Sequence, residues 1–280
     1  MNSFSQKYLI DKILRDALVE DIGEGDITTN SIIKPGKKLT GRLMAKEKGI
    51  IAGINVFAQT FHTIDENVKI DLLKADGDAC ENLEICAVLT GDSVSMLKAE
   101  RTALNIIQHL SGIATQTAQF VNIAKKYGVK IADTRKTLPG LRLLQKYAVK
   151  TGGGENHRFG LYDHILIKDN HIKAAGGITP AINFARKNAG FTHKIEVEVT
   201  NIEETEEALK NRADIIMLDN FTIEKIIEAK KLINCRAMIE ISGNVTIDNL
   251  EKYCECRPDI ISVGYLTHSV KALDFSMKLE

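Results

Sequence analysis

The stretch KIEVEVTNIEETEEALKNRADIIML (194–218) decides the fold, because it has the pattern of a strand, a helix and a second strand. Its outer runs, 194–199 and 214–218, are rich in Ile and Val, as expected for parallel strands that are covered on both faces. Thr200 and Glu203 between them fit a capping box at the start of a helix. Four further runs of this kind predict strands, namely KIAD (130–133), HILIK (164–168), AMIEI (237–241) and DIISV (259–263).

Amphipathic segments separate these six strands, and Thr179 followed by Pro180 predicts another helix start. Six βα units at this spacing indicate a parallel barrel or an open doubly wound sheet. The residues that follow the strands favour the barrel. They are Asp133 with Arg135 and Lys136, then Lys168, Glu198, Asp219 with Asn220, Ser242 with Gly243, and Gly264. In a barrel all six positions converge on one mouth, where reacting groups belong, whereas in an open sheet they would line a long edge.

The residues before 130 have a different pattern. Apolar residues at helical spacing predict a helix over 6–20, and EDIGEGDITTNS (20–31) has the composition of a loop. Short β-like runs between 39 and 91 surround a predicted helix at 55–64, which indicates a small α+β domain. The segment 95–127 is predicted to form one long helix or two abutting helices, and a break would fall at Gly112 because glycine weakens helix interiors. We therefore expect an N-terminal α+β domain at 1–105 and a βα barrel at 106–280, with the C-terminal tail free to pack back on the first domain.

Composition excludes several classes of protein. The 280 residues contain 37 Lys and Arg against 37 Asp and Glu, and only 5% are aromatic. Neither the charge nor the base-stacking residues of a nucleic-acid-binding protein are present. No apolar run is long enough to span a membrane, and the N-terminus has no signal-peptide core, so a cytoplasmic protein is expected. The five cysteines lack zinc-site spacing and are predicted to be reduced thiols.

The segment 133–172 carries a local cationic excess inside this neutral chain. Its Arg135, Lys136, His157, Arg158 and Lys168 combine bidentate donors with point charges, the set that holds carboxylates and phosphates. The alternative is a solvated basic face. Pro139 and the glycines at 152–154 favour a pocket, because such residues shape loops where backbone approaches a ligand.

Glu198 and Asp219 end successive predicted strands, and two carboxylates without His or Cys suit Mg²⁺. In the alternative, one of them only pairs with Lys168, and Lys168 itself could serve as a Schiff-base lysine if it were buried. The turns Ser242-Gly243-Asn244 and Val263-Gly264-Tyr265 could cradle phosphate oxygens. No GxGxxG or GxxxxGK[ST] motif is present, which argues against nicotinamide-cofactor oxidoreductases and P-loop NTPases.

Together these segments resemble the quinolinate phosphoribosyltransferase family over essentially the whole chain. The matching segments are AERTALNIIQHLSGIAT (99–115), DTRKTLPGLR (133–142), YAVKTGGGENHRFGLYDHILIKDNHI (147–172), EVEV (196–199), IMLDN (216–220), SGN (242–244) and SVG (262–264). The resemblance implies an N-terminal α+β sandwich on an incomplete parallel βα barrel, and a homodimer with shared active sites, which could assemble further into hexamers. It implies that quinolinate and phosphoribosyl pyrophosphate react with Mg²⁺ to give nicotinate mononucleotide, pyrophosphate and CO₂ in NAD biosynthesis.

The resemblance also implies a role for each site residue. Quinolinate would be bound by Arg135, Lys136, His157, Arg158 and Lys168, with Arg101 entering from the partner subunit, and Thr134 would be a further substrate-binding residue. Lys136 and Lys168 would also face the sugar phosphates, Glu198 and Asp219 would hold metal and ribose, and Ser242, Gly243, Asn244 and Gly264 would take the 5′-phosphate.

Two positions depart from the family pattern: Leu138 replaces a hydroxyl residue, and Asn244 replaces a common glycine, although asparagine tolerates left-handed backbone. Three alternatives remain open: a divergent relative from molybdenum-transport gene neighbourhoods, a lyase or aldolase that uses Lys168, and a non-catalytic dicarboxylate sensor.

Overall fold

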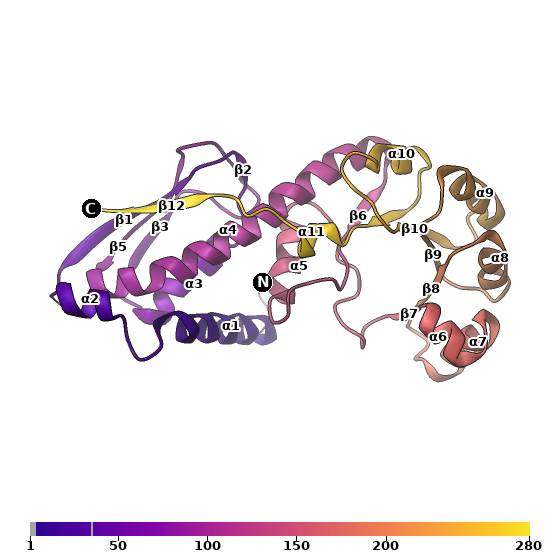
Figure 1. The fold of residues 1–280 in the computed structure, drawn as a ribbon, viewed down its shortest axis with the longest axis horizontal. Coiled ribbons are helices and arrows are strands. Elements are labelled where there is room, and N and C mark those ends of the chain that lie inside the picture. The colour runs from indigo at the N-terminus through magenta and orange to yellow at the C-terminus, as the bar shows by residue number, and fades with distance from the viewer. Residues whose placement is uncertain (1–3, 35) are drawn as a thin grey trace. The chain divides into compact units, whose positions relative to one another are not determined.

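The computed structural model describes residues 4–34 and 36–280, which divide into two compact units. The first unit comprises 1–118, 137–153 and 267–280, and the second comprises 119–136 and 154–266. The chain therefore passes between the units several times, and helix α4 (Ser93–Ala124) belongs to both. Figure 1 shows the order of the elements along the chain.

The first unit is built on a four-stranded antiparallel sheet in the order β12-β1-β5-β3. Its strands are β1 (Lys38–Ala45), β3 (Lys69–Leu72), β5 (Ile85–Asp92) and β12 (Phe275–Leu279), and β2 (Gly49–Ile50) pairs separately with β4 (Ala79–Cys80). Figure 1 shows β12, from the C-terminus, beside β1 from the N-terminal region. The C-terminal tail thus completes the sheet of the first unit.

Helices pack on this sheet to form the first unit's core. They include α3 (Ile54–Ile64) and α4, which bury Phe57, Phe61, Met96 and Ile107 against strand residues such as Leu43 and Leu89. The other helices of this unit are α1 (Phe4–Ile22), α2 (Ile27–Ile32), α5 (Arg142–Thr151) and the second half of α11 (Tyr265–His268). The predicted helix at 6–20 is confirmed, but the predicted loop at 20–31 is wrong in part. Asp26 accepts a hydrogen bond from the backbone N–H of Thr29 and so starts α2.

Of the two alternatives for 95–127, the single long helix is confirmed and the break at Gly112 is wrong, because α4 continues without interruption past this residue. A Cβ atom at Gly112 would lie 2.3 Å from the carbonyl oxygen of Lys271 and 2.9 Å from the Cα atom of Ala272. The glycine therefore permits a close backbone approach rather than ending the helix.

The second unit contains a six-stranded parallel sheet in the order β6-β11-β10-β9-β8-β7. Its strands are β6 (Lys130–Ala132), β7 (Ile165–Ile167), β8 (Ile195–Val199), β9 (Ile215–Asp219), β10 (Met238–Ser242) and β11 (Ile260–Ser262). All six predicted strands are therefore confirmed. The two edge strands, β6 and β7, are not paired with each other in the described part of the chain, so the predicted incomplete parallel barrel is confirmed as well.

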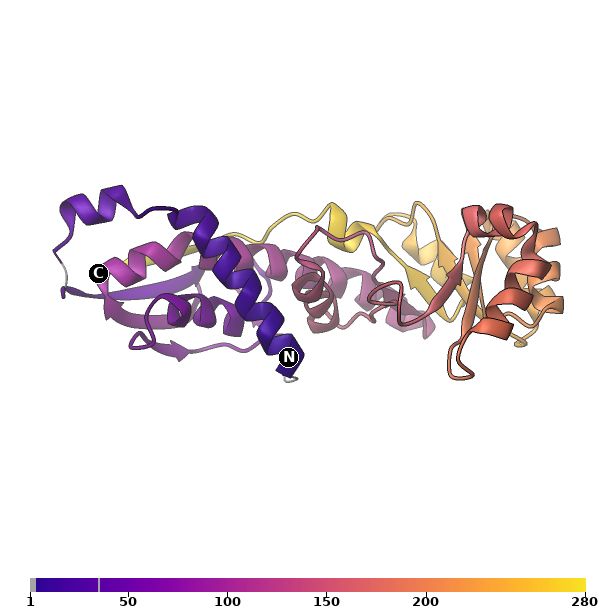
Figure 2. The same ribbon diagram turned by 90° about the horizontal axis from the view of Figure 1, so that it is seen from below.

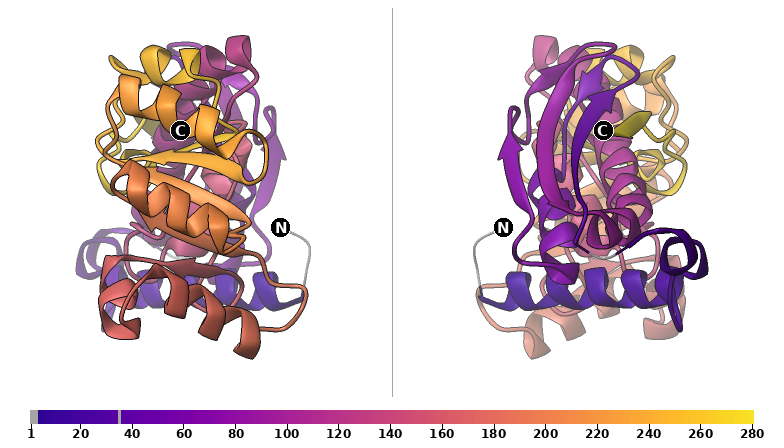
Figure 3. Two further views of the ribbon diagram at one scale, coloured as in Figure 1. Left: turned by 90° about the vertical axis from the view of Figure 1, so that its right-hand side faces the viewer. Right: turned by 90° about the vertical axis from the view of Figure 1, so that its left-hand side faces the viewer.

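Helices connect these strands: α6 (Asp169–Ala175), α7 (Ile178–Asn188), α8 (Ile202–Lys210), α9 (Ile223–Ile233) and α10 (Leu250–Glu255), while the short 3₁₀ helix η1 (Lys125–Tyr127) precedes β6. In Figure 2 and in the left panel of Figure 3, α7, α8 and α9 lie side by side on one face of the sheet. No helix in residues 4–34 and 36–280 combines the length and apolar character needed to cross a membrane.

Two helix starts differ from the sequence prediction. The cap of α8 is Asn201, whose side chain accepts a hydrogen bond from the backbone N–H of Glu204, so the predicted pair Thr200 and Glu203 is displaced by one residue. The cap of α7 is Gly177 rather than Thr179. The Thr179 hydroxyl instead donates to Glu207 on α8, so its hydrogen bond joins two helices.

Candidate active site

The predicted site residues of the second unit gather at the carboxyl ends of its strands. Thr134, Arg135 and Lys136 follow β6, Lys168 follows β7, and Gly264 follows β11. Glu198, Asp219 and Ser242 lie in the last two positions of β8, β9 and β10, and Gly243 and Asn244 continue from β10. Because the strands are parallel, these ends share one edge of the sheet.

The strand register determines which side chains share a face. Glu198 is paired with Met217, and Asp219 lies two residues beyond Met217 on the same strand. Side chains two residues apart on a strand point the same way, so both carboxylates face one side, with Asp219 one step closer to the strand ends. Ser242 is opposite Asp219 and faces this side as well.

Lys168 and Glu198 form an ion pair at 2.5 Å between Nζ and Oε2. The Glu198 side chain is 14% exposed and that of Lys168 is 44% exposed. This is the pairing that the sequence analysis held as an alternative to a metal site. It leaves the other carboxylate oxygen of Glu198 for another ligand, and the exposure of Lys168 removes the burial that a Schiff-base lysine would need.

Asn220 joins the end of β9 to the turn after β10. Its side-chain amide donates to Asp219 Oδ2 at 2.7 Å and accepts from Asn244 Nδ2 at 3.0 Å, while its backbone N–H donates to Ser242 at 3.0 Å. Gly243 and Asn244 have φ angles of 98° and 49°, so asparagine does adopt the left-handed backbone expected of it. The turn at 242–244 is thereby fixed to the carboxylate of Asp219.

Arg135 and Arg158, the arginines proposed to bind the dicarboxylate, interact electrostatically. Burial, and then the positive charge of Arg135, lower the pKa of Arg158 from its usual value. One Nη atom of Arg158 donates to the carbonyl oxygen of His164 at 3.2 Å. Two neighbouring guanidinium groups repel each other, and an anion with two carboxylates would relieve that repulsion. This arrangement suits the recognition of a dicarboxylate.

His157 is held by protein groups on both ring nitrogens. Its Nε2 lies 3.1 Å from Glu196 Oε2 and 3.5 Å from Glu240 Oε2, and its Nδ1 accepts the backbone N–H of Arg158 at 2.8 Å. Burial lowers the pKa of His157, but hydrogen bonds to the two carboxylates outweigh burial and raise the pKa to about 10. The hydrogen bond from Arg158 opposes that protonation, because an imidazolium would turn an N–H at Nδ1 toward the N–H of Arg158; the geometry therefore corresponds to the neutral ring with its proton on Nε2. Nε2 carries a proton whether the ring is neutral or charged. Direct binding of a substrate by His157 stays a prediction.

Glu196 and Glu240 are buried acids to which the sequence analysis gave no role. Burial raises the pKa of Glu196, but hydrogen bonds from His157 and His164 dominate and lower the pKa to about 2. Burial and the charge of nearby Glu196 raise the pKa of Glu240. The sequence did contain a signal for both, since a Glu in the middle of a buried Ile/Val strand is rare unless it is paired.

Arg101 and Leu138 lie in the first unit. Arg101 is an exposed residue of α4, and its part in the site stays a prediction. The backbone N–H of Leu138 donates to Gln145 Oε1 at 2.8 Å, and its side chain is 42% exposed. The missing hydroxyl at 138 is therefore compatible with an ordered loop.

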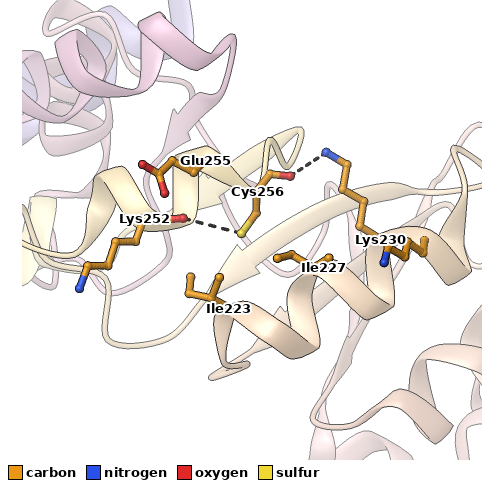
Figure 4. A pocket seen from close by; sticks show the side chains of 7 residues that line it. Ile223, Ile227, Lys230, Lys252, Glu255 and Cys256 are labelled. Carbon is orange, nitrogen blue, oxygen red and sulfur yellow. Dashed lines mark hydrogen bonds between the residues drawn. The ribbon is translucent and has the colours of Figure 1, made fainter.

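A pocket outside this set lies between α9 and α10 (Figure 4). It is lined by Ile223, Ile227, Lys230, Lys231, Lys252, Glu255 and Cys256, none of which is a predicted site residue. Lys230 points to the backbone, where it donates to the carbonyl oxygens of Cys256 and Arg257. This pocket therefore contains none of the functional groups that lie at the carboxyl ends of the strands.

Comparisons with known proteins agree with the geometry. The model of the quinolinate phosphoribosyl transferase C-terminal domain matches residues 113–278, and that of the N-terminal domain matches 26–111. A probable nicotinate-nucleotide pyrophosphorylase (carboxylating) from Methanocaldococcus jannaschii is 49% identical over 277 residues, which cover 96% of each chain. A protein of the same name from Bacillus subtilis is 46% identical, and the match covers 95% of this chain and 92% of that protein.

Solved structures are similar along the whole chain. The crystal structure of NadC from Streptococcus pyogenes superposes with a TM-score of 0.94 at 44% identity, and covers 98% of this chain and 97% of its own. A nicotinate-nucleotide pyrophosphorylase from Ehrlichia chaffeensis gives a TM-score of 0.93 at 40% identity, with complete coverage of both chains. On these grounds the chain belongs to the quinolinate phosphoribosyl transferase family.

Proposed function

We propose that this protein transfers the phosphoribosyl group of phosphoribosyl pyrophosphate to the ring nitrogen of quinolinate and removes CO₂, which yields nicotinate mononucleotide and pyrophosphate. The observation that carries the proposal is the sheet edge that bears Lys168, Glu198 and Asp219, with the interacting arginines Arg135 and Arg158 in the segments that follow β6 and precede β7. The cations suit a pyridine dicarboxylate, and the carboxylates suit a sugar that becomes positively charged during the reaction.

Each group then has a task in the reaction. The arginines would orient quinolinate so that its ring nitrogen faces the anomeric carbon, and the turn at 242–244 with Gly264 would hold the 5′-phosphate. As the bond to pyrophosphate breaks, its electrons leave with the pyrophosphate, and Glu198 and Asp219 would stabilise the oxocarbenium-like sugar. The nitrogen lone pair then forms the new C–N bond.

Decarboxylation follows from that bond. The quaternised ring is cationic and accepts the electron pair released when the 2-carboxylate leaves as CO₂, after which a proton replaces it on the ring carbon. Bond formation therefore precedes decarboxylation.

The carboxylates of this site could supply some of the ligands of Mg²⁺. Glu198 has one oxygen paired with Lys168, and Asp219 lies one register step away on the same face. Two staggered carboxylates suit an ion that keeps waters and substrate oxygens as its other ligands. We propose that Glu198 and Asp219 hold Mg²⁺ together with pyrophosphate oxygens, where it would neutralise charge on the leaving group.

The test is the release of pyrophosphate and CO₂ by purified protein given quinolinate and phosphoribosyl pyrophosphate. Nicotinate, which lacks the 2-carboxylate, should have a kcat/KM at least about 100-fold lower, because each lost charged hydrogen bond costs about 1.5–3 kcal/mol. Comparable kcat/KM for nicotinate would refute the substrate assignment, and an absence of pyrophosphate release would refute the reaction. Turnover would also exclude a sensor.

We also propose a homodimer in which Arg101 completes the partner's site. Its exposed position in the first unit, and the exposed apolar side chains of Tyr8, Val19, Ile27 and Ile32 in that unit, support this proposal. Arg101→Ala and Lys168→Ala proteins should each be nearly inactive. Refolding them together should restore roughly a quarter of wild-type activity, because about half of the dimers are mixed and each contains one intact site. Mixed dimers without activity would show that Arg101 serves its own subunit.

A further inference from the structure

Two buried carboxylates lie beneath the candidate active site. Glu196 on β8 is 0% exposed and Glu240 on β10 is 1% exposed. Glu240 is opposite Met217, as is Glu198, so all three side chains face one side of the sheet, and Glu196 precedes Glu198 by two residues on that same side. Burying carboxylates inside a barrel is costly unless charge partners compensate for the lost hydration.

The partners come from one loop. His164 Nε2 lies 2.7 Å from Glu196 Oε2, and His157 Nε2 lies 3.1 Å from the same oxygen. Both histidines belong to the segment between the glycines at 152–154 and strand β7. One carboxylate oxygen thus fixes this loop at two points that are seven residues apart in sequence.

Arg158 depends on both of these points. Its backbone N–H donates to His157 Nδ1 at 2.8 Å, and its guanidinium donates to the carbonyl oxygen of His164 at 3.2 Å. The backbone N–H of His157 also donates to buried Asp133 at 2.9 Å. The position of the Arg158 guanidinium therefore follows from contacts that end on Glu196.

His157, Glu196 and Glu240 also have the composition of a metal site, since one ligand atom of each lies within 4.8 Å of the others. The hydrogen bonds argue against that use. A metal at His157 Nε2 would require the ring's proton on Nδ1, but Nδ1 faces the N–H of Arg158 at 2.8 Å. The two N–H groups would then oppose each other. The cluster is therefore better explained as a hydrogen-bonded support.

We propose that Glu196, assisted by Glu240, is a positioning residue that orients Arg158 toward the carboxylates of quinolinate. The inference rests on the proposed function and adds two residues to it. Neither carboxylate contacts substrate in this scheme. They hold the loop, so that the guanidinium of Arg158 is in place before quinolinate binds. The loop then does not have to become ordered during binding.

The test compares the KM values of the two substrates. Glu196→Leu should raise the KM for quinolinate at least tenfold and leave the KM for phosphoribosyl pyrophosphate within twofold, because the turns proposed to bind its 5′-phosphate follow β10 and β11 rather than β8. Glu196→Gln keeps an acceptor oxygen and should recover part of the loss. Glu240→Gln, whose carboxylate is 3.5 Å from His157, should have a smaller effect than either.

Glu207→Gln is the matched control, because Glu207 accepts two hydrogen bonds from Thr179 on the outer helices, away from the cluster. It should lower the melting temperature without changing the ratio of the two KM values. Calorimetry with quinolinate alone should reproduce the affinity order of the Glu196 variants.

An unchanged KM ratio in Glu196→Gln and Glu240→Gln, or a change in Glu207→Gln equal to theirs, would overturn the positioning role. If wild-type protein turned over quinolinate in either case, the proposed function would stand while this inference fell. A wild-type protein that does not use quinolinate would instead refute the function itself.

Discussion

Gly243 offers the sharpest test of the phosphate turn. Its φ angle is 98°, in the left-handed region that glycine favours. A Cβ atom there would lie 2.3 Å from Asn220 Oδ1 and 2.9 Å from the backbone nitrogen of Asn220. Gly243→Ala therefore combines an unfavourable backbone angle with a steric overlap, and the backbone contact cannot be relieved by a side-chain rotation.

The magnitude follows from the groups that must move. Left-handed backbone costs a residue with a side chain about 1–2 kcal/mol. Displacing the Asn220 amide would break its hydrogen bonds with Asp219 and Asn244, each worth about 0.5–1.5 kcal/mol. We expect Gly243→Ala to lower the free energy of unfolding by about 2–5 kcal/mol, and to raise the KM for phosphoribosyl pyrophosphate at least tenfold.

Gly128→Ala is the control. Gly128 has a φ angle of 72°, but nothing lies within 4 Å of an added Cβ, and it precedes β6 at the amino end of the sheet. It should lose about 1–2 kcal/mol of stability from backbone strain alone and keep both KM values within twofold. Urea unfolding and initial-rate kinetics measure both quantities. If Gly243→Ala were no less stable than Gly128→Ala and bound phosphoribosyl pyrophosphate normally, the assignment of this turn would be wrong.

Three further outcomes are expected. Gly112→Ala should lower the free energy of unfolding by about 1–3 kcal/mol in urea, because the new methyl group would overlap the Lys271 carbonyl. This loss should exceed the gain in helix propensity, and a stabilised variant would contradict the reasoning. Burial and the hydrogen bond to Asp76 raise the pKa of Tyr147 to about 12. The wild-type protein should therefore have a higher free energy of unfolding than Tyr147→Phe below pH 10, and this difference should disappear as the pH rises through 12. A difference that persisted above pH 12 would refute this reasoning. Glu198→Ala should lower turnover while calorimetry shows quinolinate affinity within roughly threefold; a collapse of that affinity would reassign Glu198 to the pyridine.

The sequence predicted the elements of the second unit well because its strands are short Ile/Val runs between polar helices. It placed helix starts less well. Thr200 and Asn201 are both good caps, and only the tertiary position of the strand end decides that Asn201 is used. At Thr179 the hydroxyl binds Glu207 of the next helix, a partner that no local pattern reveals.

Gly112 shows the same limit in the first unit. Local propensity treats glycine in a helix as a weak point, and the alternative of two helices that meet at Gly112 followed from that rule. The reason for the glycine lies about 160 positions later in the chain, where the backbone at 271–272 passes close to α4. A single sequence records the small residue but does not record its neighbour.

The candidate site shows why residues at strand ends are easier to propose from sequence than the residues that support them. Two strands carry their polar residues in pairs two positions apart, Glu196 with Glu198 and Glu240 with Ser242. Within each pair both side chains face one side, and the second lies closer to the carboxyl end of the strand. The second member meets substrate in the proposed reaction, whereas the first is buried and can act only through other protein groups. Strand ends can be located from sequence, and so can residues placed on them. The partners of a buried acid come from a distant loop, so the supporting role of Glu196 and Glu240 could be inferred only once His157 and His164 were seen beside them.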